Sequence, residues 1–469
     1  MRFLVAYKLP IVLLLAIVAR VSVFALFPDT FTFDQTGTIH GSAAYDTYAV
    51  NLLATGIYGK TAPGVADAHL PPLYSYLLAG LYGVFGRSSL AVVLLHIALD
   101  CASIALLYHL SKRLFPHGEW VGMWAGVFYA LYPYLIFQNL TLIDTPLFMT
   151  LFYAFLLLAL MLRQRTSLDR GTWGLAVLAG VVLGLTALTR PNALIIAPLV
   201  GLWFLFRRSL WQSVLRLLPV AVVSVLVLIP WTIRNFSVYG VFVPVALNGG
   251  ENFYQGNNQY TIPYFSAGYD VQWVPPPDLP ENASDLGVER NAALMQAGLD
   301  YLRENPGVIP DLLWTKFLVH WSIDIMPLRN PTAGELPRIN YRGDTIAETD
   351  EEGDLAISGL PPGDPVDEYS GGTFELGRII HRYYYGALFL IALVGLVLSL
   401  PHWREVSLLW MVQIGMTVAY MIFHPSTRYR VPTDPLLFAF SAYVLVWLWL
   451  RLRRGASPSV VHHIPERAA

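Results

Sequence analysis

The chain contains ten stretches of apolar residues, each near the length that crosses a lipid bilayer. A transmembrane helix needs roughly 20 predominantly apolar residues. Because the interior of a bilayer offers no partner to backbone N–H and C=O groups, such stretches cross it as helices. The sequence therefore predicts an all-α polytopic membrane protein of about ten transmembrane helices, at residues 9–27, 89–110, 119–138, 147–162, 173–189, 192–206, 214–231, 383–400, 406–423 and 435–450.

The composition supports this class and excludes several soluble ones. Of the 469 residues, 55% are hydrophobic and 13% are charged, whereas a soluble domain carries about 25% charged residues. The single cysteine, Cys101, excludes an intramolecular disulfide bond and a thiolate metal cluster. The sequence contains no P-loop, dinucleotide fingerprint or His/Cys metal spacing, and no basic patch for nucleic acid. We expect a lipid bilayer, and no nucleic acid, as a partner.

The positions of Lys and Arg predict the orientation, because cytoplasmic loops are enriched in these residues. The first span follows Arg2 and Lys8; it is long and lacks a clear small-residue cleavage site, so we interpret it as a retained anchor. Counting residues 71–86 as a span would invert Arg2 and Lys8, so we place this Tyr-rich segment in the outer interface. We predict a cell-membrane protein with both termini cytoplasmic. The cytoplasmic cluster adds Lys112, Arg113, Arg163, Arg165, Arg170, Arg207, Arg208, Arg216, Arg404, Arg451, Arg453 and Arg454.

Two long segments are predicted on the outer face. The second, residues 232–382, contains 21 of the 32 acidic residues of the chain against nine Lys and Arg. Its stretch 343–370 is acidic and turn-rich, and amphipathic helices are expected at 285–305 and 308–325. The predicted division is an N-terminal transmembrane core (1–231) with a first outer loop (28–88) bearing interfacial helices, a mixed extracytoplasmic domain (232–382), C-terminal transmembrane helices (383–454) and a cytoplasmic tail (455–469).

Four arginines break the cytoplasmic pattern, since they lie at the outer ends of predicted spans. Ionisable side chains at membrane depth are costly and indicate function. A planar guanidinium group suits bidentate binding of phosphate; the alternative is that each arginine snorkels to lipid headgroups. Because the four share one face, we predict a phosphate site formed by Arg190, Arg234, Arg428 and Arg430.

Acidic residues on the same face are the candidate catalytic groups. Asp144 lies in a loop too short to leave the membrane surface, and Asp34 and Asp46 lie in the first outer loop. A carboxylate in a partly apolar cleft can act as a general base or bind a divalent cation, although an acid in a loop is ordinarily solvated. We predict Asp46, Asp144 and Asp34 as catalytic. If a divalent metal takes part, Asp46 and Asp144 would hold it, and no other cofactor is expected.

The substrate cleft is expected to contain His69, Tyr74, Asn257 and Asn258. His69 precedes the segment that carries Tyr74, and its imidazole could bind a phosphate or a hydroxyl. The asparagines close a glycine-rich turn after a span. Glycine permits close backbone approach, and amides both donate to and accept from hydroxyls. A glycine-rich linker into the outer domain would leave the same pattern.

The order of these blocks resembles that of the GT-C membrane glycosyltransferases of glycosyltransferase family 39. That family includes protein O-mannosyltransferases and the lipid A aminoarabinose transferase. The resemblance covers most of residues 1–260 and returns around 424–436. Its blocks are YDTYAVNLLATGIYG (45–59), HLPPLYSYLLAGLYGVFG (69–86), LIDTPLF (142–148), GLTALTRPN (184–192), PWTIRNF (230–236), GGENFYQGNN (249–258) and RYRVPTDP (428–435).

The resemblance implies that a sugar moves from a polyprenyl-phosphate-linked donor to a lipid, glycan or protein acceptor on the extracytoplasmic face, with inversion. The arginines would then bind the donor phosphate. The family's catalytic acid lies a few residues before the YD block, where this chain has Gly41 or Ser42. Asp46 is therefore the first choice for the base and Asp34 the second, while Asp144 matches the family's second acid.

Two alternatives remain at this point. A lipid-linked transporter or flippase would carry charges deep within several spans and helices broken at the midplane, whereas the charges here gather at one face. An O-antigen-ligase-like transferase would rely on Arg and His without a catalytic acid, and the missing acid before Tyr45 keeps this alternative open.

Overall fold

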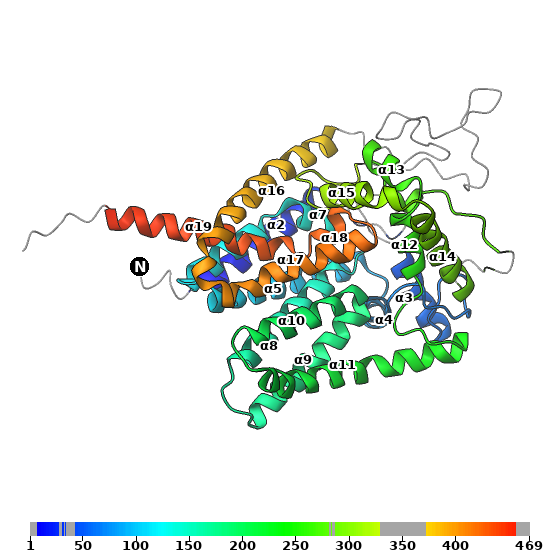
Figure 1. Cartoon of the computed structure of the whole chain (residues 1–469), viewed down its shortest axis with the longest axis horizontal. Coiled ribbons are helices and arrows are strands. Elements are labelled where there is room, and N and C mark those ends of the chain that lie inside the picture. The colour runs from blue at the N-terminus through cyan, green and yellow to red at the C-terminus, as the bar shows by residue number, and fades with distance from the viewer. Residues whose placement is uncertain are drawn as a thin grey trace, which may run out of the picture.

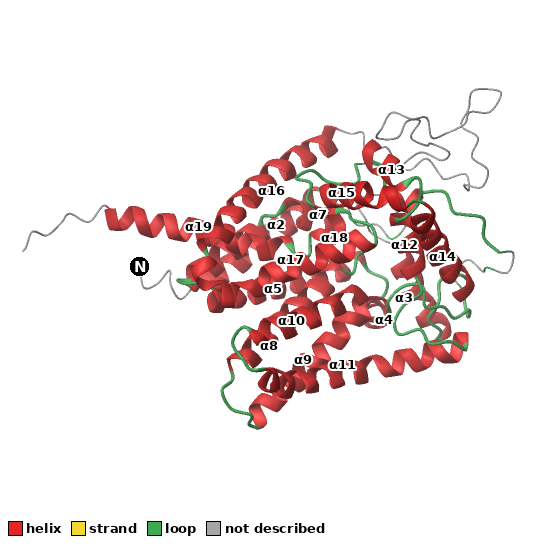
Figure 2. Ribbon diagram, in the orientation of Figure 1, coloured by secondary structure: helices red, strands yellow, loops and turns green. Residues whose placement is uncertain are grey.

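The computed structural model describes residues 7–27, 31, 33, 43–280, 283, 287–328 and 372–455. Within these ranges the regular structure is helical and no strand occurs (Figure 2). Eight of the described helices are long and apolar enough to cross a membrane, which confirms the predicted all-α polytopic fold. They are α2 (Lys8–Leu26), α5 (Ser89–Leu114), α8 (Thr145–Gln164), α9 (Arg170–Thr189), α11 (Leu210–Tyr239), α16 (Gly372–Leu398), α17 (Trp403–Ile422) and α19 (Asp434–Gly455).

The other two predicted spans, 119–138 and 192–206, form shorter helices because of proline. A proline lacks the N–H that a continuing helix needs, and its fixed φ suits the first turn of a new one. Pro133 accordingly begins a short second helix within the first of these spans, and Pro191 begins a 3₁₀ turn at the start of the other. The pieces are α6 (Gly118–Ala130), α7 (Pro133–Gln138), η2 (Pro191–Ile195) and α10 (Ile196–Leu205).

Short helices gather at one end of the bundle, which we call the α14 end (Figure 1). Among them, α4 covers the segment predicted for the outer interface. Its 13 residues extend about 20 Å, too little to cross a hydrocarbon core of roughly 30 Å. The expected amphipathic helices are α14 and α15, and the acidic stretch 343–370 lies outside the described residues. The set comprises α3 (Ala43–Thr55), α4 (Leu73–Phe85), α12 (Gly249–Gly256), α13 (Thr261–Ala267), η3 (Val271–Trp273), α14 (Val288–Glu304), η4 (Pro306–Val308) and α15 (Ile309–His320).

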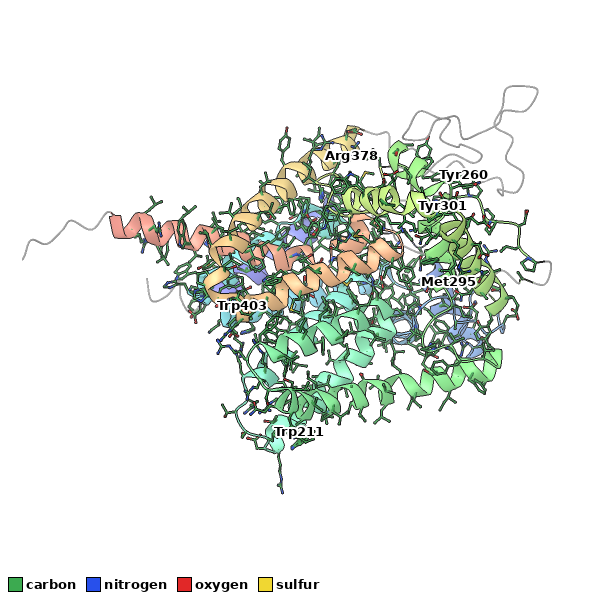
Figure 3. The ribbon with its side chains drawn as sticks, viewed as in Figure 1. Trp211, Tyr260, Met295, Tyr301, Arg378 and Trp403 are labelled. Atoms are coloured by element: carbon green, nitrogen blue, oxygen red, sulfur yellow. The ribbon has the colours of Figure 1, made fainter. Side chains whose placement is uncertain are left out.

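Aromatic side chains occupy both ends of the bundle. Trp211 and Trp403, at the starts of α11 and α17, lie away from the α14 end, whereas Tyr260 and Tyr301 lie at it (Figure 3). Trp and Tyr favour the two membrane–water interfaces because one part of the ring is apolar and another is polar. The long helices between these ends therefore have the arrangement of a membrane-spanning layer.

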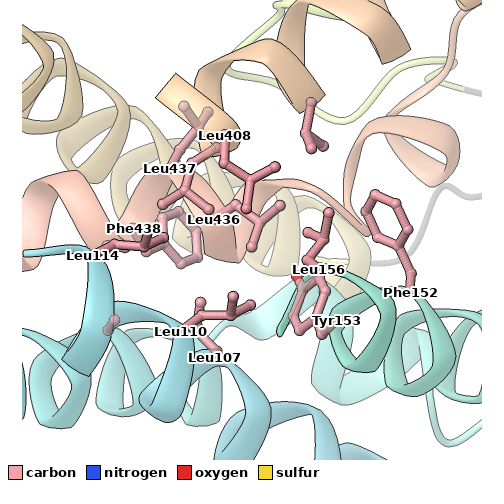
Figure 4. Packing of buried hydrophobic residues seen from close by; sticks show 14 of the residues in the cluster. Leu107, Leu110, Leu114, Phe152, Tyr153, Leu156, Leu408, Leu436, Leu437 and Phe438 are labelled. Atoms are coloured by element: carbon pink, nitrogen blue, oxygen red, sulfur yellow. The ribbon is translucent and has the colours of Figure 1, made fainter. Parts of the chain in front are cut away.

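The main core joins α5, α8, α17 and α19, whose buried leucines and aromatic residues interdigitate (Figure 4). Leu110, Leu156 and Phe438 are completely buried within it. Lipid tails are as apolar as leucine, so packing and interhelical hydrogen bonds, and not removal from water, hold such helices together. The core fixes the ends of these helices relative to one another, and with them the turns at the α14 end.

Helices α9 and α11 pack closely because glycines face the contact. A Cβ at Gly180 would lie 2.7 Å from the carbonyl oxygen of Val220, and one at Gly184 would lie 2.6 Å from Cβ of Val227. Two glycines four residues apart on one face let helix backbones approach closely in membranes. This contact determines where the C-terminal end of α9 lies, directly before Arg190.

A polar cluster also ties the N-terminal helices together. Arg20 of α2 donates from Nε to Asp100 of α5 at 2.5 Å. The other carboxylate oxygen accepts from Tyr129 at 2.9 Å and from Asn139 at 2.6 Å. All four side chains are buried, and a buried ion pair with such hydrogen bonds between helices stabilises one packing arrangement.

Candidate active site

A cavity of about 550 Å³ opens at the α14 end. Its walls come from the first outer loop, the start of α8, the break between α9 and η2, α12, and the turn between α17 and α18 (Thr427–Arg430). These segments are distant in sequence and meet because the long helices that carry them pack in one core. The charged and histidine side chains that line the cavity are Lys60, His69, Asp144, Arg190, Glu251, His424 and Arg428.

Asp144 and Arg190 form a bidentate ion pair on one wall. Arg190 Nε lies 2.7 Å from Oδ2 of Asp144, and Nη2 lies 2.6 Å from Oδ1 and 2.8 Å from the hydroxyl of Thr145. Asp144 directly precedes α8, and Pro191 holds Arg190 in an extended conformation at the end of α9. Burial disfavours the charged guanidinium, but Asp144 outweighs it and raises the pKa of Arg190. Arg190 is therefore a fixed cation, with its Nη1 buried and without a hydrogen bond.

Arg428 lines the same cavity and forms no ion pair with an acid in the described part of the chain, although Asp144 and the buried Asp270 act on it electrostatically. Its guanidinium lies 5.8 Å from the ring centre of Tyr429, and its Nε is buried without a hydrogen bond. Burial lowers the pKa of Arg428, but Tyr429, Tyr45 and Asp144 together raise it above its ordinary value. A cation with unused donors therefore faces the cavity.

The two histidines of the cavity are neutral near pH 7. Burial lowers the pKa of His424 to about 3, and Lys316 and Arg428 add to the effect. Burial and then Lys60 lower the pKa of His69 to about 4. Three cations (Lys60, Arg190, Arg428) thus face two carboxylates (Asp144, Glu251), which leaves the lining with a net charge of +1. This balance favours an anionic ligand.

Tyrosines form the apolar part of the wall. Tyr420 and Tyr429 stack with their ring centres 5.1 Å apart, and Asn192 donates to the hydroxyl of Tyr420. Tyr45 of α3 also lines the cavity. Aromatic faces with polar tips can hold a ligand that is partly apolar and partly hydroxylated.

The structure does not bring Asp46 into this cavity. Its carboxylate accepts from Arg87 Nε and Nη2 at 3.1 and 2.8 Å and from the hydroxyl of Tyr82 at 2.9 Å. Successive residues of a helix point about 100° apart, so Tyr45 faces the cavity while Asp46 faces α4. Asp46 and Asp144 accordingly do not converge, and no group of three or more potential metal ligands occurs in the described part of the chain. Asp34 lies outside the described residues.

Arg234 and Arg430 also lie outside the cavity lining. Arg234 donates to the carbonyl oxygens of Asp67 and Tyr58 at 2.7 and 2.6 Å and so ties α11 to the first outer loop. Arg430 is completely buried, pairs with Asp434 at 3.1 Å, and donates to two further main-chain carbonyls. Arg234 and the Nε and Nη1 of Arg430 thus donate within the fold, and Nη2 of Arg430 is buried without a hydrogen bond but away from the cavity lining.

Of the predicted cleft residues, His69 lines the cavity and the other three support it. Tyr74 is buried and bonds the Nε2 of His96 at 2.8 Å. Asn257 donates to the carbonyl of Ile422 and accepts from Lys316 at 2.9 Å. Asn258 donates to the carbonyl of Tyr254 at 2.7 Å. The bonds of Asn257 and Asn258 fix the C-terminal end of α12, and earlier residues of the same helix line the cavity.

The sequence interpretation did not single out several lining residues. Glu251 belongs to the GGENFYQGNN block and is the single acidic residue between Asp169 and Asp270. That isolation is the signal that could have marked it. Lys60 directly follows the YDTYAVNLLATGIYG block, and this adjacency is the sequence signal that could have identified it as a lining residue. Tyr420 and Gln272 carry no signal in a single sequence, because only the tertiary fold brings them to the cavity.

Comparison with known proteins confirms the predicted resemblance to the GT-C membrane glycosyltransferases. Residues 69–233 match the family model of the dolichyl-phosphate-mannose-protein mannosyltransferases. This range includes His69, Asp144 and Arg190. No curated protein sequence matches the chain significantly.

Solved structures of an archaeal oligosaccharyltransferase show a similar fold at low sequence identity. The archaeal oligosaccharyltransferase AglB from Archaeoglobus fulgidus, in complex with an inhibitory peptide and a dolichol-phosphate, matches with a TM-score of 0.55, 15% identity, and coverage of 97% of this chain and 51% of that one. The same enzyme with Zn and sulfate matches with a TM-score of 0.53, 15% identity, and coverage of 95% and 50%. This chain thus spans about half the length of those structures. ArnT from Cupriavidus metallidurans, bound to undecaprenyl phosphate, matches with a TM-score of 0.38, 12% identity, and coverage of 95% and 81%.

Proposed function

We propose that this protein transfers a sugar from a polyprenyl-phosphate carrier to a lipid, glycan or protein acceptor in the cavity at the α14 end. The observation that carries the proposal is Arg428, a partly buried cation that forms no ion pair in the described chain, in the same cavity as the buried Asp144–Arg190 pair. The family match and the fold support a transferase. The related archaeal enzyme was solved with dolichol-phosphate, a ligand of the same chemical class.

The donor phosphate would lie between the two arginines. Arg428 offers its free guanidinium, and Arg190 offers the Nη1 that the Asp144 carboxylate leaves unused. Charge-assisted hydrogen bonds from guanidinium to phosphate are strong and directional. As the sugar departs, negative charge grows on the carrier phosphate, and preorganised cations stabilise that charge most in a site shielded from water. Direct displacement would invert the anomeric centre.

The α14 end would face the extracytoplasmic side. At the opposite end, Lys8 and Lys112 pair with Glu119, and Arg163 and Arg207 pair with Glu405. Basic residues that gather at one end of a bundle favour the cytoplasm there. The protein would then act in the cell membrane with its termini inside.

A binding measurement tests the phosphate site. Undecaprenyl phosphate is titrated into the purified full-length protein in detergent, and the dissociation constant is measured by native mass spectrometry. Arg428→Ala removes a charged hydrogen-bond donor worth about 1.5–3 kcal/mol, so affinity should fall about 10- to 100-fold. Arg428→Lys should recover part of the loss, because an ammonium keeps the charge but not the planar fork.

The matched control is Arg303→Ala, which removes an exposed arginine of α14 outside the cavity. It should bind undecaprenyl phosphate like the wild type. Equal affinity in the wild type and Arg428→Ala would contradict the phosphate site.

A further inference from the structure

The acidic groups of the cavity differ in what they already bind. Both oxygens of Asp144 accept from Arg190, so this carboxylate is held in an ion pair. Glu251 is the other acidic residue in the described lining. Its side chain is 33% exposed and lies beside His69, with Nε2 3.7 Å from Oε2. Lys60 also interacts with it electrostatically. The separation from His69 exceeds a direct hydrogen bond, so the carboxylate of Glu251 keeps its acceptor capacity.

The fold holds Glu251 in place through its backbone. Glu251 lies in the first turn of α12, directly after Gly250. The N–H of Gly250 donates to the side chain of Asn291 at 2.7 Å, and a Cβ at Gly250 would lie 1.9 Å from the main-chain oxygen of Asn291. Glycine therefore allows α12 to press against α14, and this contact directs Glu251 toward the cavity.

His69 is positioned as firmly on the other side. The main-chain N–H of His69 donates to Oδ1 of Asp67 at 3.1 Å. The main-chain N–H of Lys60 donates to Oδ2 of the same carboxylate at 2.7 Å. Burial lowers the pKa of His69 to about 4; Lys60 and Arg290 act in the same direction and Asp67 opposes them. A neutral imidazole beside a carboxylate leaves it ionised, and Nε2 at 3.7 Å would need to approach Oε2 by less than about 1 Å to donate a hydrogen bond to it.

We propose that Glu251 is the proton acceptor of the sugar transfer and that His69 orients it; this inference rests on the function proposed above. The O–H bond of the acceptor breaks and its proton passes to the Glu251 carboxylate. The acceptor oxygen forms a bond to the anomeric carbon with its electron pair. The bond from that carbon to the phosphate oxygen breaks, and its electron pair leaves with the carrier phosphate, held by Arg190 and Arg428.

The assignment explains how a chain with Gly41 and Ser42 where its relatives' acid is expected could still supply a base. The proposed base belongs to α12, in the segment between α11 and α17, and not to the first outer loop. It also divides the cavity: the acceptor hydroxyl would lie beside Glu251 and His69, and the carrier phosphate beside the two arginines.

Turnover and binding must be measured separately on the full-length protein in liposomes. The donor probe is the lipid fraction extracted from cells that lack the protein, in which unused donor should accumulate, and the product is quantified by mass spectrometry. Undecaprenyl phosphate serves as the binding probe. Glu251→Gln should lower the rate constant about 100-fold or more, as expected for loss of a general base, with undecaprenyl phosphate affinity unchanged. Glu251→Asp should recover part of the rate, and Glu289→Gln, an exposed residue of α14, should match the wild type.

The role of His69 has its own readout. His69→Ala should lower kcat while leaving KM for the donor unchanged, because the imidazole acts on Glu251 and not on the donor phosphate. His69→Gln should restore part of kcat, since its amide nitrogen can replace Nε2 as a donor. A rise in KM without a change in kcat would contradict the positioning role.

The outcomes separate the two proposals. An active wild type whose Glu251→Gln variant keeps the same rate overturns Glu251 as the base and leaves the proposed function standing. A wild type that neither binds undecaprenyl phosphate nor transfers sugar from the lipid fraction overturns the proposed function itself. An elution profile and melting temperature like those of the wild type show that Glu251→Gln is folded.

Discussion

The part that an arginine plays in this protein depends on the acceptors that already surround it. Arg430 pairs with Asp434 and donates to two carbonyls, although its Nη2 stays unpaired away from the cavity. Arg234 donates to two carbonyls of the first outer loop. Arg190 is paired with Asp144 but keeps one free nitrogen. Arg428 forms no ion pair in the part of the chain described. Because an unpaired buried donor is costly, Arg428 gains most from an anionic ligand.

Replacing Asp46 by Asn tests the corresponding claim for an acid. Asp46 binds Arg87 and Tyr82 and faces α4. Since Arg87 is partly exposed, we expect Asp46→Asn to lower the free energy of unfolding by about 1 kcal/mol, near the value for a pair in contact with solvent. Turnover should fall far less than in Glu251→Gln. A steep loss of turnover at unchanged melting temperature would instead make Asp46 the base.

At the scale of the element, the ends of helices set the chemistry of the cavity. Helix α9 delivers Arg190 because Pro191 ends it, and the glycine face toward α11 fixes its position. Helix α12 delivers Glu251 in the same way, through Gly250 against α14. In both cases a glycine that is not itself part of the cavity lining determines the position of a charged side chain in the cavity.

A valine at Gly184 should therefore act on the cavity from a distance. Its Cβ would lie within 2.6 Å of Val227, so α9 and α11 must separate, at a cost of about 1–3 kcal/mol for overpacking. The melting temperature and the affinity for undecaprenyl phosphate should both fall, because Arg190 moves with the end of α9. Gly174→Val is the control, since a Cβ there meets no atom within 4 Å. Equal effects of the two variants would contradict the account.

At the scale of the whole molecule, the two ends differ in charge and in content. One end has lysines and arginines paired with Glu119 and Glu405. The other has the short helices and the cavity (Figure 1). A bilayer between them would separate a cytoplasmic face from the face on which the sugar is transferred.

Cysteine labelling in cells tests this orientation, in a Cys101→Ser background that removes the native thiol. Arg303→Cys at the α14 end should react with a membrane-impermeant maleimide in intact cells. Arg170→Cys, at the exposed start of α9, should react only after permeabilisation. The reverse pattern would place the cavity in the cytoplasm and contradict transfer at the outer face.

Most of the fold follows from the sequence because apolar length and proline determine where helices lie. Eight of the ten predicted spans are helices long enough to cross a membrane, and the other two are shortened where Pro133 and Pro191 begin new helices. The short helix α4 was likewise foreseen from the length and tyrosine content of its segment. The glycines at 180 and 184 were visible in the sequence, but the face that they share with α11 became apparent only in the fold.

The candidate site was less accessible to sequence reasoning. Arg190, Arg428, Asp144 and His69 were predicted and line the cavity. The direction of a side chain on a short helix depends on a register that one sequence does not fix, which is why Tyr45 and not Asp46 faces inward. The main-chain carbonyls that accept hydrogen bonds from Arg234 belong to a segment distant in sequence. The residues next to Arg234 in the chain therefore do not reveal that its donors are already used.

The most direct test of the account is a cryo-EM structure of the protein in a lipid nanodisc with undecaprenyl phosphate. We predict phosphate density in the cavity, with oxygens about 3 Å from the guanidinium nitrogens of Arg428 and from Nη1 of Arg190. Glu251 should lie on the opposite side of that density, with space for an acceptor hydroxyl between them. Phosphate bound elsewhere, with the cavity between Arg190 and Arg428 unoccupied, would contradict the central claim.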